Sequence, residues 1–149
     1  MIALHAGWYL SLTIETLFFP HPITQSIRWL ALLVFLLAQA LRFWTLRTLG
    51  GFWNISVLTN KSDASHFVRH GPYRFVRHPN YLVVILELLT LPLVGDAPFT
   101  AAAFTIANGI LLARRIPLEE SQLLKIPGYA REMRIKPRFI PTLFAKGRR

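Results

Sequence analysis

Residues 27–46 read IRWLALLVFLLAQALRFWTL, and this stretch decides the class of fold. It is apolar over about the 20 residues that a helix needs to cross roughly 30 Å of hydrocarbon. Three other apolar stretches, 2–19, 80–95 and 99–113, accompany it, and the last two are shorter. We therefore expect an all-α integral membrane bundle of about four transmembrane helices.

The composition supports a membrane protein of one domain, residues 1–149. Hydrophobic residues make up 53% of the chain and charged residues 16%, below the roughly 25% charged residues of a soluble domain. The ten prolines and eight glycines suit membrane helices, which tolerate both. The absence of cysteine excludes disulfides, thiolate metal sites and cysteine nucleophiles.

The net charge of +10 would suit a nucleic-acid partner, but its distribution indicates a membrane protein instead. Of the 17 Lys and Arg residues, all but Arg28 and Arg42 fall in residues 47–77 and 114–149. Positive residues collect on the cytoplasmic side of membrane proteins. We therefore expect both basic blocks, both termini and the active site to be cytoplasmic, with the turns at 20–26 and 95–97 outside. No nucleic-acid partner is expected.

Proline and acidic residues predict two helix starts. Asp96 is expected to cap a helix whose first turn contains Pro98. Pro117 is expected in the first turn of a separate C-terminal helix, with Glu119 and Glu120 at the positive end of its dipole. An alternative interpretation of this region is a surface-lying amphipathic tail held by anionic lipids.

The most informative motif, GPYRFVRHPNY at residues 71–81, directly precedes a membrane stretch. Asn80 and Tyr81 fall near the start of that helix, where backbone donors favour an anionic group. An interfacial anchor is an equally good interpretation, since Tyr and Arg are common at membrane edges.

A second motif combines Arg114 and Arg115 with Glu119 and Glu120. The two carboxylates could bind an ammonium or sulfonium cation, and the two arginines one turn earlier could bind a carboxylate of the same ligand. The alternative is an ordinary ion pair between Arg115 and Glu119.

Polar residues inside the apolar stretches form a third set of candidates. Arg42, Glu87 and Asn108 fall at a similar estimated depth, where isolated charges are costly. They could form a functional site or a purely structural Arg42–Glu87 pair. No metal site is expected from the histidines, because Asp63 is the only acid near His66 and His70.

In combination, these motifs resemble the isoprenylcysteine carboxyl methyltransferase family of membrane enzymes, most of all its short bacterial members. The resemblance covers residues 41–141, the expected cofactor-binding core. The matching residues are Leu49-Gly50, Gly71-Pro72-Tyr73-Arg74, Arg77-His78-Pro79-Asn80-Tyr81, Arg115, Glu119-Glu120, Tyr129 and Arg138-Phe139-Ile140-Pro141. Val83 replaces a common glycine, Glu132 replaces a tyrosine, and the N-terminal part is short.

The resemblance implies S-adenosylmethionine bound between the central loop and the C-terminal helix. The residues that would line the cofactor pocket are Phe67, Val68, Tyr73, His78, Pro79, Asn80 and Tyr81. His66 or Ser65 would occupy the position of a further family histidine. Glu119 would hold the amino-acid end of the cofactor, and Arg115 would face the methyl acceptor. If the acceptor is a hydroxyl, a base is needed, and Glu120 or a histidine is the candidate.

The sequence therefore predicts an S-adenosylmethionine-dependent methyltransferase in the bacterial inner membrane. It would transfer a methyl group to a carboxylate or hydroxyl oxygen of a lipophilic or prenylated acceptor. Two alternatives stay open: an NADPH-dependent membrane reductase of the sterol type, which carries a similar Arg-His-Pro-Asn-Tyr run, and a non-enzymatic scaffold or transport subunit.

Overall fold

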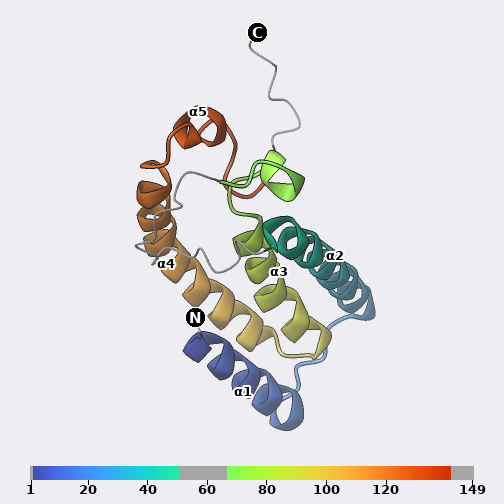
Figure 1. Cartoon of the computed structure of the whole chain (residues 1–149). Helices are drawn as coiled ribbons and strands as arrows, with labels where there is room; N and C mark the ends of the chain where they lie inside the picture. Colours follow the sequence, from blue (N-terminus) through green and yellow to red (C-terminus); the bar gives the residue numbers. More distant parts are fainter. Residues whose placement is uncertain (1, 51–66, 142–149) are drawn as a thin grey trace. The chain divides into compact units, whose positions relative to one another are not determined.

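A computed structural model describes residues 2–50 and 67–141, and all the regular elements in these ranges are helices (Figure 1). The α-helices are α1 (Ile2–Phe18), α2 (Gln25–Leu49), α3 (Pro79–Val94), α4 (Pro98–Leu123) and the short α5 (Tyr129–Met133). A 3-10 turn, η2 (Gly71–Arg74), precedes α3. The predicted all-α class is confirmed.

Helix α2 is the described helix that is both long and apolar enough to cross a membrane, with a mean hydropathy of 1.7. Only 17% of its most apolar window is buried within the protein, so Leu30, Leu33 and Leu37 point outward. Such a surface suits lipid better than water. Helix α3 is apolar but shorter, and the predicted number of four crossings remains a prediction.

The chain divides into two compact units, which are described separately. The first comprises residues 1–40 and 83–114, and the second comprises residues 41–82 and 115–149. Helices α2, α3 and α4 each contribute residues to both units.

The first unit is built around Trp8, Val84 and Leu88, all buried, with Phe104 packed against them. At one end of this unit, the turn after α1 contacts the turn between α3 and α4. The His21 amide donates to the Asp96 carbonyl (3.1 Å), and the Ile23 amide donates to the Asp96 carboxylate (3.0 Å). These contacts join the two turns that the charge pattern assigns to the same side of the membrane.

The cap of α4 differs from the prediction. Asp96 adopts a positive φ of 57°, and its carboxylate accepts bonds from Arg28 and from the Ile23 amide. The amides of Phe99 and Thr100 instead donate to the Glu15 carboxylate, at 3.0 and 2.7 Å. The unpaired amides at the start of a helix attract a carboxylate, and here one from another helix provides it. Pro98 is the first residue of α4, as predicted.

The prediction of a new helix at Pro117 is wrong, because α4 continues through this proline to Leu123. Proline lacks an amide hydrogen and crowds the preceding turn, but membrane helices tolerate it where other groups satisfy the freed carbonyls. Glu119 and Glu120 consequently lie near the C-terminal end of a helix. The helix dipole cannot stabilise them there, so their stabilisation must come from neighbouring cations and donors.

Two of the three polar residues in the apolar stretches, Glu87 and Asn108, have clearly different surroundings. Glu87 accepts a hydrogen bond from Gln39 in α2 at 2.7 Å. Asn108 is completely buried, and its side-chain amide has no hydrogen-bond partner among the described residues. The pairing of Arg42 with Glu87 remains a prediction.

Candidate active site

The second unit contains the loop before α3 and the C-terminal tail, and backbone hydrogen bonds join the two. The Arg77 amide donates to the Pro137 carbonyl (2.9 Å), and the His78 amide donates to the Arg138 carbonyl (3.0 Å). Lys136 adds a bond from its ammonium group to the Tyr73 carbonyl (2.9 Å). The tail therefore lies along the loop that carries the GPYRFVRHPNY motif.

A glycine lets this loop approach α2 closely. Gly71 has a φ of +59°, and a Cβ added there would lie 2.3 Å from the Thr48 hydroxyl oxygen. A side chain at this position would clash with Thr48, and its backbone would be strained. The first residue of the motif is therefore needed for its conformation and not for its chemistry.

Glu120 joins the loop, α4 and the tail through its carboxylate. Its Oε1 lies 2.9 Å from Arg77 Nη1 and 3.1 Å from His78 Nε2. Arg138 donates to both oxygens, from Nε at 3.1 Å and from Nη2 at 2.8 Å. Burial acts to raise the pKa of Glu120, but the bonds from Arg138 and His78 and the charge of Arg77 outweigh it and lower the pKa. A carboxylate held ionised in this way is a poor general base.

Glu119, the residue before Glu120 in α4, has a different environment. Tyr81 donates its hydroxyl hydrogen to Glu119 Oε2. The His78 ring stacks on the Tyr81 ring with centroids 5.5 Å apart, and Arg115 lies 5.8 Å from the centre of the same ring. The two motifs predicted to act together thus meet at Tyr81.

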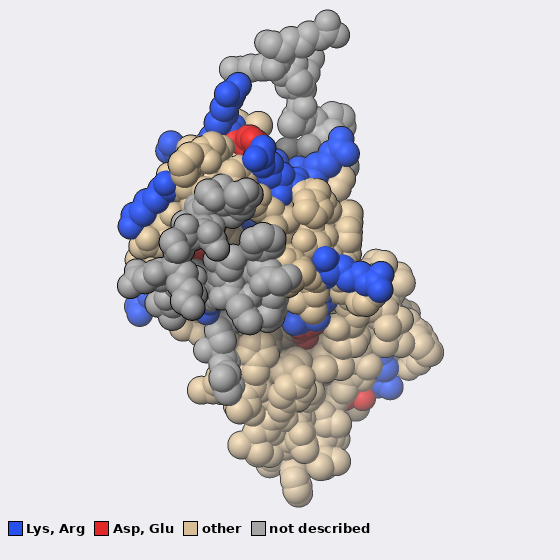
Figure 2. All heavy atoms as spheres, viewed as in Figure 1, with Lys and Arg blue, Asp and Glu red and all other residues tan. Residues whose placement is uncertain are grey.

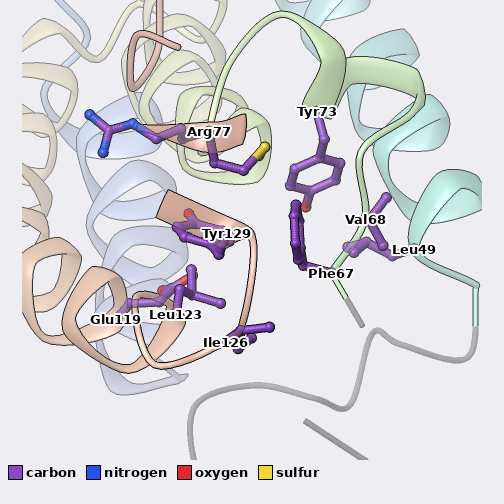
Figure 3. A pocket seen from close by; sticks show the side chains of 10 residues that line it. Leu49, Phe67, Val68, Tyr73, Arg77, Glu119, Leu123, Ile126 and Tyr129 are labelled. Carbon is purple, nitrogen blue, oxygen red and sulfur yellow. The ribbon is translucent and has the colours of Figure 1, made fainter. Parts of the chain in front are cut away.

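A pocket opens beside these groups (Figure 3), with about 670 Å³ of empty space, part of it continuous with solvent. Most of its wall is apolar or aromatic, and Glu119 and Arg77 contribute the charged groups. The lining residues are Leu49, Phe67, Val68, Tyr73, Arg77, Glu119, Leu123, Ile126, Tyr129 and Met133. A largely apolar hollow with a few polar groups is typical of a small-molecule site.

Two tyrosines in this wall are held in their neutral form. Burial, followed by the charge of Glu119, raises the pKa of Tyr73 to about 12. Burial also raises the pKa of Tyr129 to about 12, although the Arg77 charge opposes the shift. The Phe67 ring meets the Tyr129 ring edge-on at 5.2 Å. The wall therefore presents hydroxyl donors and aromatic faces at physiological pH.

The predicted cofactor residues fall into three groups. Phe67, Val68, Tyr73 and Glu119 line the pocket. His78 and Tyr81 are not lining residues but contact Glu120 and Glu119, respectively. His66 lies outside the described residues.

Pro79, Asn80 and Arg115 are also absent from the lining residues. Pro79 begins α3, and Asn80 Oδ1 is buried without a hydrogen-bond partner in the described part of the chain. The predicted grouping of the two motifs is thus seen, although only some of their residues reach the pocket.

Several lining residues had no predicted role. Arg77, Tyr129 and Leu49 lie within the motifs quoted from the sequence, which offered the only signal for them. Leu123 follows Glu119 by one helical turn and could have been placed on its face. Ile126 and Met133 gave no signal, because they lie outside the quoted motifs, on either side of Gly128, which has a φ of +83° and precedes α5.

Comparison with known proteins gives a consistent assignment. The isoprenylcysteine carboxyl methyltransferase (ICMT) family matches residues 29–125. The chain is 38% identical over 124 residues to the uncharacterized protein YpbQ of Bacillus subtilis, covering 83% of this chain and 71% of YpbQ. It is 33% identical over 130 residues to the protein-S-isoprenylcysteine O-methyltransferase of Tribolium castaneum, covering 85% of this chain and 45% of that enzyme.

The fold agrees with the sequence comparison. The structure of the eukaryotic intramembrane Ras methyltransferase ICMT superimposes with a TM-score of 0.67 at 27% identity, covering 89% of this chain and 50% of that one. The chain thus spans about half the length of the named methyltransferases that it matches. Since the family match extends over more than half of the sequence, this chain belongs to the isoprenylcysteine carboxyl methyltransferase (ICMT) family.

Proposed function

We propose that this chain transfers a methyl group from S-adenosylmethionine to a carboxylate or hydroxyl oxygen of a lipophilic acceptor at the cytoplasmic face of the membrane. S-adenosylmethionine is the methyl donor of ICMT enzymes, and when bound it supplies a methyl group on a positively charged sulfur. The named relatives are O-methyltransferases, which favours this reaction over a sterol-type reduction or a scaffold role.

The observation that carries the proposal is the pair of opposite charges in the pocket wall. Glu119 provides a carboxylate, which suits the ammonium group of an amino acid, and Arg77 provides a guanidinium, which suits its carboxylate. Arg77 Nε is buried without a hydrogen-bond partner among the described residues. The same guanidinium is paired with Glu120 through Nη1 at 2.9 Å, so a ligand carboxylate would share it with Glu120. The residues present thus fit the amino-acid end of the cofactor.

The remaining wall suits the other end of the cofactor. Phe67 and Tyr129 offer aromatic faces for a heterocycle, and Tyr73 offers a hydroxyl that stays protonated. We assign Arg115 to the acceptor, where a guanidinium would orient a carboxylate through two parallel hydrogen bonds. An ionised carboxylate needs no base, so this assignment requires none from Glu120.

The acceptor class follows from the membrane setting. Helix α2 carries exposed leucines, which suit a lipid environment, so a prenylated or other lipophilic acceptor could reach the active site along the bilayer. The positions of the basic blocks support an inner-membrane protein with both termini and the site in the cytoplasm. Acceptors can be identified by incubating the protein with labelled S-adenosylmethionine and a panel of prenylated, polyketide and phospholipid compounds.

Variants of the two charged motif residues test the proposed site. Glu119→Gln should weaken binding of S-adenosylhomocysteine by about tenfold or more, since it removes a charge-assisted hydrogen bond. Arg115→Ala should mainly reduce turnover or acceptor affinity. Glu132→Gln, outside the pocket lining, is the matched control and should bind normally in calorimetry. Unchanged affinity in Glu119→Gln would remove Glu119 from the binding site.

A further inference from the structure

The C-terminal tail carries two highly exposed isoleucines among mostly charged residues. Ile135 and Ile140 are 82% and 76% exposed, more than any other large hydrophobic residue in the described ranges. They do not belong to a membrane-spanning helix, since both follow α5 in irregular backbone. Exposed arginines, Arg131 and Arg134, precede them in the same segment. This combination of apolar and basic side chains is typical of segments that lie at a membrane surface.

The hydrogen bonds between loop and tail set the position of these isoleucines along the membrane normal. The bonded residues, Arg77 and His78, immediately precede the apolar helix α3, which begins at Pro79. Their partners in the tail, residues 137 and 138, therefore lie beside the first turn of α3, which is the membrane boundary in the topology that the sequence predicts. Ile135 and Ile140 are two residues from this pair on either side, within about 7 Å of extended chain.

Two aromatic residues mark the same level of the second unit. Phe75, two residues before Arg77, and Trp44, near the end of α2, are both 48% exposed. Their ring centroids are 6.4 Å apart. Partly exposed tryptophan and other aromatic rings favour the boundary between hydrocarbon and headgroups. Phe75 belongs to the loop whose Arg77 and His78 bond to the tail, so aromatic side chains of the kind found at membrane boundaries occur in the same loop.

The positive charge around residues 131–140 indicates a membrane surface with anionic lipids. Exposed arginines are found in the loop (Arg74) and in the tail (Arg131 and Arg134), and Figure 2 shows Lys and Arg gathered over these elements. The acid between the tail arginines, Glu132, forms an ion pair with Arg69 (2.6 Å). The positive excess attracts anionic headgroups.

We infer that residues 131–140 form a membrane-surface anchor, in which Ile135 and Ile140 insert among lipids and Arg131 and Arg134 bind anionic phospholipid headgroups. The anchor adjoins the pocket, because Tyr129 and Met133 in its wall lie at the start of the same tail. The inference concerns membrane binding and stands independently of the reaction proposed above.

The absence of cysteine allows a direct test on the full chain. Ile135→Cys, Ile140→Cys and, as a control, the exposed Ser121→Cys would each carry an environment-sensitive fluorophore in lipid nanodiscs. Nanodiscs of phosphatidylcholine alone would be compared with nanodiscs that also contain phosphatidylglycerol. Quenching by nitroxide-labelled lipid reports contact with the bilayer, and quenching by aqueous iodide reports contact with water.

We expect lipid quenching at 135 and 140 to exceed that at 121 by about twofold or more, and to rise further with phosphatidylglycerol. High salt or the double variant Arg131→Gln/Arg134→Gln should remove the rise. Equal iodide quenching at all three positions would overturn the anchor and would favour a tail that faces water or an acidic protein. Insertion independent of phosphatidylglycerol would overturn the role of the arginines.

Discussion

Replacing Glu120 with glutamine tests whether one carboxylate holds the loop, α4 and the tail together. The substitution keeps the shape of the side chain and removes its charge. The side chains of Arg77 and Glu120 are only 17% and 12% exposed, so a charge-assisted bond there should contribute about 1.5–3 kcal/mol. Arg138 is 47% exposed, and its bond should add less than about 1 kcal/mol.

The glutamine carbonyl can still accept one of these hydrogen bonds. We therefore expect Glu120→Gln to cost about 2–3 kcal/mol, because Arg77 loses its counter-charge. For a chain of this size that corresponds to a fall of roughly 5–10 °C in the thermal midpoint. The measurement is thermal unfolding in detergent followed by circular dichroism.

Glu132→Gln provides a matched control, since it removes the same charge from an exposed pair. Arg69 and Glu132 are 61% and 39% exposed, so this variant should lose less than about 1 kcal/mol. Equal losses in the two variants would refute the role assigned to Glu120.

The pH dependence provides a second check on the same variant. The pKa of Glu120 is lowered in the folded protein, so its contribution is complete above the ordinary carboxyl pKa of about 4.3. It disappears as the pH falls through the lower folded value. The difference in stability between the native protein and Glu120→Gln should therefore shrink at acidic pH, and a constant difference would contradict the ion-pair account.

Three further predictions concern the loop, a tyrosine and the topology. Gly71→Ala should lower the thermal midpoint more than Gly128→Ala, because both glycines have positive φ but only at 71 would the new Cβ meet Thr48. The titration of phenolate absorbance should be the same in Tyr73→Phe and in the native protein up to about pH 11, since burial raises the pKa of Tyr73 to about 12. If the variant lacked a tyrosine that titrates near pH 10, this prediction would be contradicted. Reporter fusions in residues 47–79 and at the C-terminal end should both report the cytoplasm, and opposite sidedness would exclude a site made from both segments.

The sequence could predict the helices because their main determinant is local. The apolar stretches at 2–19, 27–46 and 80–95 correspond to α1, α2 and α3 within a few residues. A helix in lipid must satisfy its own backbone groups along an apolar run, and such a run is visible in the sequence. Pro98 also marked the start of α4 correctly.

The remaining features depend on contacts between distant residues. Nothing near α4 indicates that Glu15 caps it, and Pro117 carries no local sign that the helix continues through it. Phe67, Val68, Tyr73 and Glu119 could be placed in the pocket through motifs, whereas Ile126 and Met133 reach it only because the tail folds back along the loop. The engagement of Glu120 by Arg77, His78 and Arg138 likewise appears only in three dimensions.

The hydrogen bonds between the tail and the loop also determine when the pocket can form during synthesis of the chain. Arg69 can form its ion pair only after Glu132 has been synthesised, and the Arg77 amide can form its hydrogen bond only after Pro137 has been synthesised. By then the apolar helices have already left the ribosome and can have entered the bilayer. A chain interrupted between Leu123 and Met133 would keep α1 to α4 and lack part of the pocket wall. Formation of the apolar helices and completion of the pocket wall are therefore separable events, and the residues between Leu123 and Met133 decide the second.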